Sequence, residues 1–333
     1  MTLAVETRQL TRLFKRRKPF FKKAKAEENG GDTLALDKVD LQIKEGELFG
    51  MLGPNGAGKT TLIKILATLL LPTSGYAAVA GHDVTGDPFP IRKQINMVSG
   101  GESSGYGLLT VRENIWMFSQ FYGIPSKQAK AKIDELMHVF GLWEKRNEKV
   151  RGISTGQRQK MNMIRGLVTE PSIFFLDEPT LGLDVNASRV IREYIRDWVK
   201  KQSGKTILLT THYMMEAEML CDRIAIINKG QILACDTPEN LKRRIKQDST
   251  FRIEVDALKD MDGFAAIPGV RNFSAANDIA KNTTRLTFIL SDESAVSDIM
   301  SRVMGQGSRI QSLQKSDPTL EDVFVAMCGR GLE

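Results

Sequence analysis

The sequence contains no long hydrophobic run and no closely spaced cysteines. Its most apolar window, residues 63–71, is short and is interrupted by Lys64, whereas a transmembrane helix needs about 20 apolar residues, so no membrane-spanning segment is expected. The first residues of the chain lack the apolar core of a signal peptide. Because there are only three cysteines and no CxxC motif, we expect free thiols in a reducing compartment and exclude a disulfide framework.

The excess of positive over negative charge in the chain comes from one segment. Residues 12–25 carry eight Lys or Arg side chains and no acid, and these eight exceed the net charge of +7, so the rest of the chain is nearly neutral. This distribution does not indicate a nucleic-acid-binding fold, and no nucleic-acid partner is expected. The length of 333 residues, with 41% hydrophobic residues, is sufficient for a large domain and a smaller one.

Strands alternate with helices along the first two thirds of the chain. This order predicts a layered α/β core with a largely parallel sheet, an antiparallel β subdomain and a helical subdomain at about 105–150. The expected strands lie at 3–10, 34–43, 48–53, 173–176, 207–212 and 223–235; the expected helices lie at 60–70, 111–122 and 126–140, with two more between 156 and 202.

The pattern changes after a charged helix expected at residues 239–246. The expected strands lie at 251–255, 284–290 and 309–314, and the expected helices at 292–304 and 319–327. No cluster of acids and bases and no Gly-rich loop for an anion occurs in this part. We therefore expect a small α+β domain that serves for packing or for contact with a partner.

A Gly-rich loop joins the buried strand at 48–53 to the following helix. Its sequence GPNGAGKT, Gly53–Thr60, has the spacing of a phosphate-binding loop, in which glycines let backbone N–H groups surround a phosphate chain. Lys59 would place its charge on the outer phosphates, and the Thr60 hydroxyl would ligate Mg²⁺. The alternative is a Gly-rich turn that binds nothing. The nucleotide-binding residues expected here are Asn55, Gly56, Ala57, Gly58, Lys59, Thr60 and Thr61.

A second apolar segment ends in two adjacent carboxylates. Asp177 and Glu178 follow the strand at 173–176, and Pro179 stops the strand at these acids. A buried strand that delivers paired acids to its end predicts a metal site at Asp177 and a proton acceptor for an attacking water at Glu178. The alternative is a pair of surface acids after a strand.

These residues resemble those of ATP-binding-cassette (ABC) ATPase domains, a class of phosphate-loop ATPases. The resemblance covers residues 3–240 and rests on five motifs that occur in the family's order. They are the Walker A loop Gly53–Thr60, the signature Ser154–Gln157, Walker B at Leu176–Glu178 with its catalytic glutamate, the D-loop at Leu183-Asp184 and the switch histidine in Thr211-His212.

The resemblance implies a set of roles and a domain division. Glu178 and His212 would be catalytic, and ATP and Mg²⁺ would be the cofactors. The ABC ATPase domain would span residues 1–240, with a basic insertion at 15–32, and an accessory domain would span 241–333. The residues implied to bind the ATP of a second ATPase subunit are Ser154, Thr155, Gly156, Gln157 and Asp184.

The sequence departs from the family pattern at three places. Thr155 replaces a glycine of the signature, and no glutamine follows the strand at 95–99, where Glu102 is the nearest side chain that could reach a metal or lie in solvent. The insertion interrupts the segment after Phe14, the aromatic residue expected to stack on adenine. Residues 15–25 would contact anionic lipid or an acidic partner, or form a solvated loop.

The function that this resemblance implies is that of the ATPase subunit of an ABC transporter. Separate transmembrane permease subunits, contacted through residues 105–150, would move the substrate, and the accessory region resembles that of exporter subunits. The subunit would lie at the cytoplasmic face of the membrane and pair with a second ATPase subunit, identical or not. The alternatives are a soluble ABC ATPase that acts on a ribosome or DNA, and a regulatory subunit that binds nucleotide without hydrolysing it.

Overall fold

The chain folds into two compact units in a computed structural model that describes residues 2–15, 31–100, 105–201, 204–244, 249–258, 260–278, 282–316 and 319–328. The units span Met1–Ile232 and Leu233–Glu333, and each is described by itself. The division expected from the sequence falls slightly later, between residues 240 and 241. Residues 16–30 of the basic insertion, and with them most of the expected lipid contact, lie outside the described residues, as does Glu102.

The centre of the first unit is a six-stranded sheet with the strand order β10-β9-β3-β8-β7-β6. Strands β3, β7 and β8 are buried along their whole lengths, because helices cover both faces of a parallel sheet. The bounds are β3 Leu48–Leu52, β6 Ile95–Ser99, β7 Ile173–Asp177, β8 Thr206–Thr211, β9 Arg223–Asn228 and β10 Gln231–Asp236. The pairs β3/β8, β3/β9, β7/β8 and β6/β7 are parallel, so these strands end at one edge.

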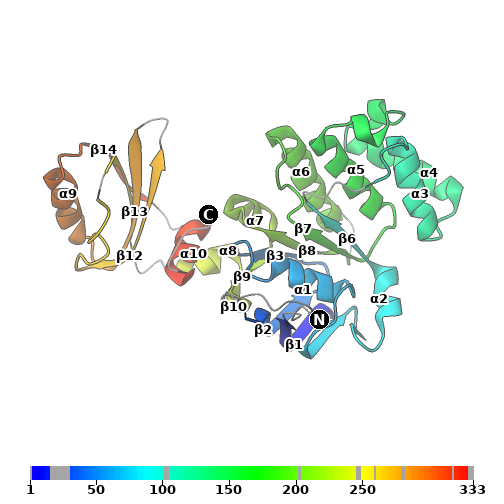
Figure 1. The fold of residues 1–333 in the computed structure, drawn as a ribbon, viewed down its shortest axis with the longest axis horizontal. Coiled ribbons are helices and arrows are strands. Elements are labelled where there is room, and N and C mark those ends of the chain that lie inside the picture. The colour runs from blue at the N-terminus through cyan, green and yellow to red at the C-terminus, as the bar shows by residue number, and fades with distance from the viewer. Residues whose placement is uncertain are drawn as a thin grey trace, which may run out of the picture. The chain divides into compact units, whose positions relative to one another are not determined.

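A second, antiparallel sheet has the order β2-β1-β4-β5. Its strands are β1 Leu3–Phe14, β2 Thr33–Lys44, β4 Ser74–Val79 and β5 His82–Asp83. Strand β2 buries every second residue toward its end, as the alternation in the sequence predicts. Helix α1, Lys59–Leu66, lies on the side of the central sheet that faces this second sheet, while α5 and α6 lie on the opposite side (Figure 1).

Four helices of this unit agree closely with the expected ones: α3 Val111–Phe121, α4 Ser126–Val139, α5 Thr155–Leu167 and α6 Val185–Lys201. The unit also contains α2 Pro88–Gln94 and α7 Met214–Leu220, and α7 was not expected from the sequence. Thr110 begins α3 with a capping box, because its side chain accepts from the Glu113 N–H while the Glu113 carboxylate accepts from the Thr110 N–H. Two short 3₁₀ helices, Trp143–Lys145 and Val150–Gly152, lead from α4 toward α5.

The second unit is an antiparallel sheet with the order β12-β13-β11-β14. Its elements are α8 Pro238–Arg243, β11 Ser249–Asp256, β12 Val270–Asp278, β13 Thr283–Leu290, α9 Ala295–Gly305, β14 Ile310–Ser316 and α10 Leu320–Cys328. Phe251 and Phe288 of the sheet and Ile299 of α9 belong to one buried core. Strand β12 was not predicted, because its sequence VRNFSAAND has no regular alternation of apolar residues; in the structure none of its residues is fully buried.

Helix α5 approaches the central sheet at Gly166. A Cβ atom at this position would lie 2.8 Å from a ring carbon of Phe174 and 2.9 Å from a methyl of Val98. We expect Gly166→Ala to lower the free energy of unfolding by about 1 kcal/mol, since overpacking of about 1–3 kcal/mol outweighs the gain in helix propensity. Urea unfolding measures this difference. Gly305→Ala is the matched helical control, because nothing lies within 4 Å of its Cβ, and an equal effect of both substitutions would contradict the packing argument.

Candidate functional site

The loop between β3 and α1 is held in a conformation that requires glycine. Gly58 has φ +107°, and a Cβ atom there would lie 2.4 Å from the carbonyl oxygen of Ala35. Asn55 and Gly56 are exposed at the tip of the loop, whereas Ala57 is buried. The loop therefore leads directly into α1, whose first N–H groups have no partner within the helix.

Lys59 reaches back across this loop to the neighbouring strand end. Its side chain is 4% exposed, and its ammonium donates to the carbonyl oxygens of Gly53, at 2.7 Å, and Pro54, at 3.2 Å. It also lies 3.1 Å from Oε1 of Glu178. The phosphate-type loop and the paired acids, which are more than a hundred residues apart in the sequence, are thus in direct contact.

Asp177 is positioned by the strand beside it. In the register of β7 and β8, Asp177 pairs with Thr210, and the Thr210 hydroxyl donates to Asp177 Oδ1 at 2.6 Å. Asp177 is 7% exposed, and its Oδ2 has no hydrogen-bond partner among the described residues. Thr210 was not predicted as a site residue. Its place next to the last residue of the strand TILLTT, two residues before His212, was the available signal.

Glu178 and His212 meet where β7 and β8 end. Nδ1 of His212 lies 3.1 Å from Oε2 of Glu178. Glu178 has φ +50°, and its N–H donates to the carbonyl oxygen of Thr210 at 3.0 Å, so the chain turns sharply as it leaves the strand. This turn directs the Glu178 side chain toward Lys59 on one side and His212 on the other.

The chain after β6 packs tightly against this turn. The Gly100 N–H donates to the carbonyl oxygen of Asp177 at 2.7 Å, and a Cβ atom at Gly100 would lie 1.8 Å from the carbonyl oxygen of Glu178. This contact gives a physical reason why no side chain, glutamine included, stands at position 100.

The segment Ser154–Gln157 forms the start of α5. Ser154 caps this helix in a capping box with Gln157, and both Ser154 and Thr155 are exposed. A Cβ atom at Gly156 would lie 3.3 Å from Oδ2 of Asp184, whose Oδ1 accepts from the Ala187 N–H at 2.8 Å. The signature and the D-loop therefore lie side by side at the surface.

Phe14 lies at the end of β1, opposite Thr33 of β2. It is 39% exposed, and the Arg12 guanidinium lies 4.6 Å from its ring centroid. The strand β2 also contributes Ala35, which contacts the phosphate-type loop at Gly58. Phe14 thus pairs with the strand that contacts the phosphate-type loop, and the Arg12 guanidinium lies on its ring. The stacking of Phe14 on adenine stays a prediction.

The residues present fit a nucleotide and a divalent cation. Backbone N–H groups and the Lys59 ammonium suit phosphate oxygens. The Thr60 hydroxyl and the Asp177 carboxylate are oxygen ligands of the kind that suit Mg²⁺, which keeps most of its ligands as water and phosphate. No cluster of three or more His, Cys, Asp or Glu that could hold a metal by itself occurs in the part of the chain that the structure describes.

The chain is similar to ATP-binding proteins of transporters. Residues 36–181 match the ABC transporter family, and residues 237–328 match the C-terminal domain of DrrA1-3-like ATP-binding proteins. Daunorubicin resistance ATP-binding protein DrrA3 of Streptomyces coeruleorubidus is 33% identical over 91% of this chain and 94% of that protein. The chain belongs to the ABC transporter ATP-binding proteins. The Nod factor export ATP-binding protein I of Burkholderia orbicola is 32% identical over 92% of this chain and 96% of its own length.

Solved ABC structures share the fold of the first unit. The dimeric structure of the ATP-binding cassette MJ0796 in a post-hydrolysis state, bound to ADP and Pi, superposes with a TM-score of 0.61 at 26% identity, over 70% of this chain and 98% of that one. The predicted fold class, family and ATPase activity are thereby confirmed. Subunits of this ABC family bind nucleotide, dimerise and pair with membrane permeases. Across the described ranges, no helix of this ABC protein is long and apolar enough to span a bilayer.

Proposed function

We propose that this chain hydrolyses ATP with Glu178 and thereby powers export through separate membrane-spanning subunits. The proposal rests on two contacts of the Glu178 carboxylate. The Lys59 ammonium lies 3.1 Å from its Oε1, and Nδ1 of His212 lies 3.1 Å from its Oε2. A cation suited to phosphate, a carboxylate suited to water and an imidazole meet at one sheet edge. The alternative of a regulatory subunit without hydrolysis gives no reason for this arrangement.

Each of these side chains has a distinct part in the reaction. Lys59 places its charge on the outer phosphates of ATP and balances the charge that develops as the terminal phosphate leaves. The Glu178 carboxylate orients the attacking water and accepts its proton. His212 holds the carboxylate from the opposite side, so that Glu178 faces the reacting phosphate in one orientation.

The cation site that we propose consists of Thr60 and Asp177. The Thr210 hydroxyl orients the Asp177 carboxylate through Oδ1, which leaves Oδ2 for the cation or one of its waters. Mg²⁺ at this position would neutralise the phosphate oxygens during the reaction.

A complete site also needs a second ATPase subunit. Ser154 and Thr155 are exposed at the start of α5, where N–H groups and the positive end of the helix dipole face outward and attract an anion. We propose that this end binds the terminal phosphate of the ATP held by the other subunit. The second subunit is a copy of this chain or a related one.

The direction of transport rests on the relatives. Their printed names include daunorubicin resistance and Nod factor export, and one of them spans almost the same length as this chain, accessory region included. These names support export as the direction of transport. They give no support to the alternative of action on a ribosome or on DNA.

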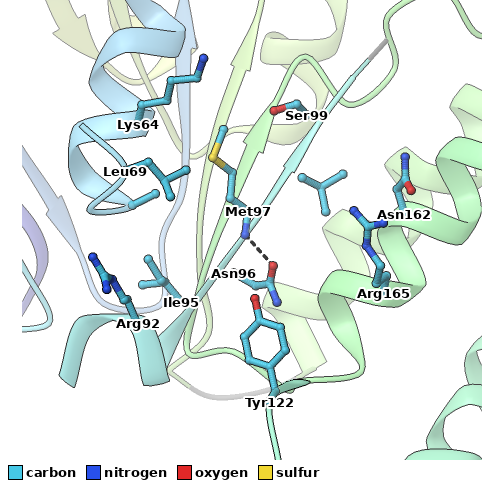
Figure 2. A pocket seen from close by; sticks show the side chains of 12 residues that line it. Lys64, Leu69, Arg92, Ile95, Asn96, Met97, Ser99, Tyr122, Asn162 and Arg165 are labelled. Carbon is cyan, nitrogen blue, oxygen red and sulfur yellow. Dashed lines mark hydrogen bonds between the residues drawn. The ribbon is translucent and has the colours of Figure 1, made fainter. Parts of the chain in front are cut away.

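The groove that we propose for the permease subunit lies beside β6. It has a volume of about 470 Å³ and is lined on one side by Lys64, Leu69 and Arg92, and on the other by Tyr122 and Arg165 (Figure 2). Leu69 is 68% and Tyr122 52% exposed. Exposed apolar side chains next to three cations suit a short amphipathic segment that carries a carboxylate.

A charge placed in this groove should separate the ATPase from its permease. We expect Leu69→Glu to lower the amount of permease that co-purifies by about tenfold, because the carboxylate would be buried against an apolar segment. The ATPase activity of the purified chain should stay unchanged. Leu233→Glu is the matched control, since Leu233 of β10 is 40% exposed and lies outside both the groove and residues 105–150. Equal losses of permease for both variants would contradict the proposal.

A further inference from the structure

A buried glutamate lies close to the catalytic pair without being part of it. Glu216 of α7 is 3% exposed and follows His212 by four residues in the sequence. Its Oε1 accepts from the Thr180 hydroxyl at 2.8 Å, and Thr180 itself is 5% exposed. Thr180 in turn follows Glu178 by two residues. The hydrogen bond thus joins the two chain segments that carry the catalytic side chains.

The position of this bond is more informative than its strength. The backbone pairing of β7 with β8 ends where the Glu178 N–H donates to Thr210, and beyond that point the two segments diverge. One becomes the turn from Glu178 to Leu181, and the other becomes α7. The bond from Thr180 to Glu216 connects them outside the sheet, beyond the ends of β7 and β8, and is separate from the contact between Glu178 and His212.

Burying the carboxyl group of Glu216 to make this link costs free energy. Its Oε2 is buried and has no hydrogen-bond partner among the described residues. Burial raises the pKa of Glu216, and the nearby Thr180 and Thr211 hydroxyls and the charges of Arg192 and His212 oppose the shift. A half-satisfied buried carboxyl group contributes little to stability, and apolar replacements of such pairs are often neutral. Its position beside the catalytic segments is therefore better explained by alignment than by stability.

We propose that Glu216 is a positioning residue for ATP hydrolysis. Through Thr180 it fixes the turn that leaves Glu178 relative to the helix that follows His212, so the carboxylate and the imidazole keep their separation of 3.1 Å. The same turn leads to Asp184, so the link also sets the start of the D-loop. This proposal rests on the catalytic roles proposed above for Glu178 and His212.

The experiment compares Glu216→Ala, Glu216→Gln and Thr180→Val in the full chain. We expect Glu216→Ala and Thr180→Val each to lower kcat by about tenfold, because small misalignments of a catalytic group have effects of this order or larger. KM for ATP should change less than about twofold, since the phosphate-binding loop is untouched. Glu216→Gln should retain most of the activity, because its amide oxygen accepts the same hydrogen bond. Combining Glu216→Ala with Thr180→Val should be no worse than either alone.

Histidine NMR provides a readout that does not depend on turnover. The chain has only three histidines, and His82 and His138 serve as internal references. The ring resonance of His212 should shift in Glu216→Ala and Thr180→Val, return in Glu216→Gln, and stay unchanged in Met219→Ala, a substitution on the exposed side of α7.

Two outcomes would overturn the proposal. One is a wild-type kcat and an unmoved His212 resonance in both disrupting variants; the other is a Gln variant as impaired as the Ala variant. If the wild-type chain hydrolysed no ATP, the proposed function would fail, yet the His212 resonance would still test the link. Thermal unfolding of each variant shows whether a lower kcat comes from misfolding of that variant.

Discussion

Replacing Glu178 with glutamine should abolish ATP hydrolysis and leave ATP binding intact. The amide has the size of the carboxylate and retains an oxygen for the Lys59 ammonium, 3.1 Å away, but it cannot accept a proton from water. We expect kcat to fall by at least about a hundredfold, the usual contribution of a general base. ATP should then remain bound between two subunits, and a dimer that is transient in the wild-type protein should accumulate.

Phosphate release measures the loss of turnover, and light scattering with and without ATP measures the dimer. Glu193→Gln is a suitable control, since Glu193 is 59% exposed on α6. Equal turnover in Glu178→Gln and the wild-type protein would contradict the assignment of Glu178 as the base. A variant that lost both turnover and ATP binding would instead indicate that Glu178 mainly holds Lys59 in place.

The predicted parts of this site are those whose function depends on local sequence. A phosphate-binding loop needs glycines at fixed spacing, so Gly58 and Lys59 are recognisable from the order of residues alone, and the strand before Asp177 is recognisable from its uninterrupted apolar run. The same holds for the capping residue Ser154, which stands directly before an amphipathic helix.

The parts that were missed depend on contacts between distant segments. Thr210 bonds to Asp177 only because β7 and β8 are neighbours in a particular register, and Thr180 bonds to Glu216 across 36 positions of sequence. No local pattern distinguishes these threonines from others. The contact that forbids a side chain at Gly100 has the same origin, because the obstructing oxygen belongs to Glu178, directly after the adjacent strand.

Strand β12 was missed for a different reason. Both faces of its sequence are partly exposed, and its place in the sheet is set by pairing with β13 rather than by burial of its own side chains. Phe273, which packs against Phe264 and Phe288, is its main contribution to the core. Val270 also packs against this core, but two apolar residues three positions apart do not give the alternation that predicts a strand.

Gly156→Asp should abolish hydrolysis by acting on the site of the other subunit. A Cβ atom at Gly156 would lie 3.3 Å from Asp184 Oδ2, so the new carboxylate would stand beside an existing one on the surface proposed to face a phosphate. An acid in the first turn of α5 is compatible with the helix dipole, so the fold should persist. We expect a loss of turnover of at least about a hundredfold, with ATP binding to the isolated subunit unchanged.

Mixing this variant with Glu178→Gln tests the shared site directly. In a mixed dimer, one site combines the intact Lys59 and Glu178 of the first subunit with the intact signature of the second, while the other site carries both defects. Because the two variants associate with equal probability, about half of the dimers in an equal mixture are mixed, and each mixed dimer has one intact site out of two. An equal mixture, combined before ATP is added, should therefore regain about a quarter of wild-type turnover. If each subunit hydrolysed its own ATP with its own signature, the mixture would stay inactive. Recovery of activity from two inactive variants would therefore require that Gly156 and Glu178 act on ATP molecules bound to different subunits.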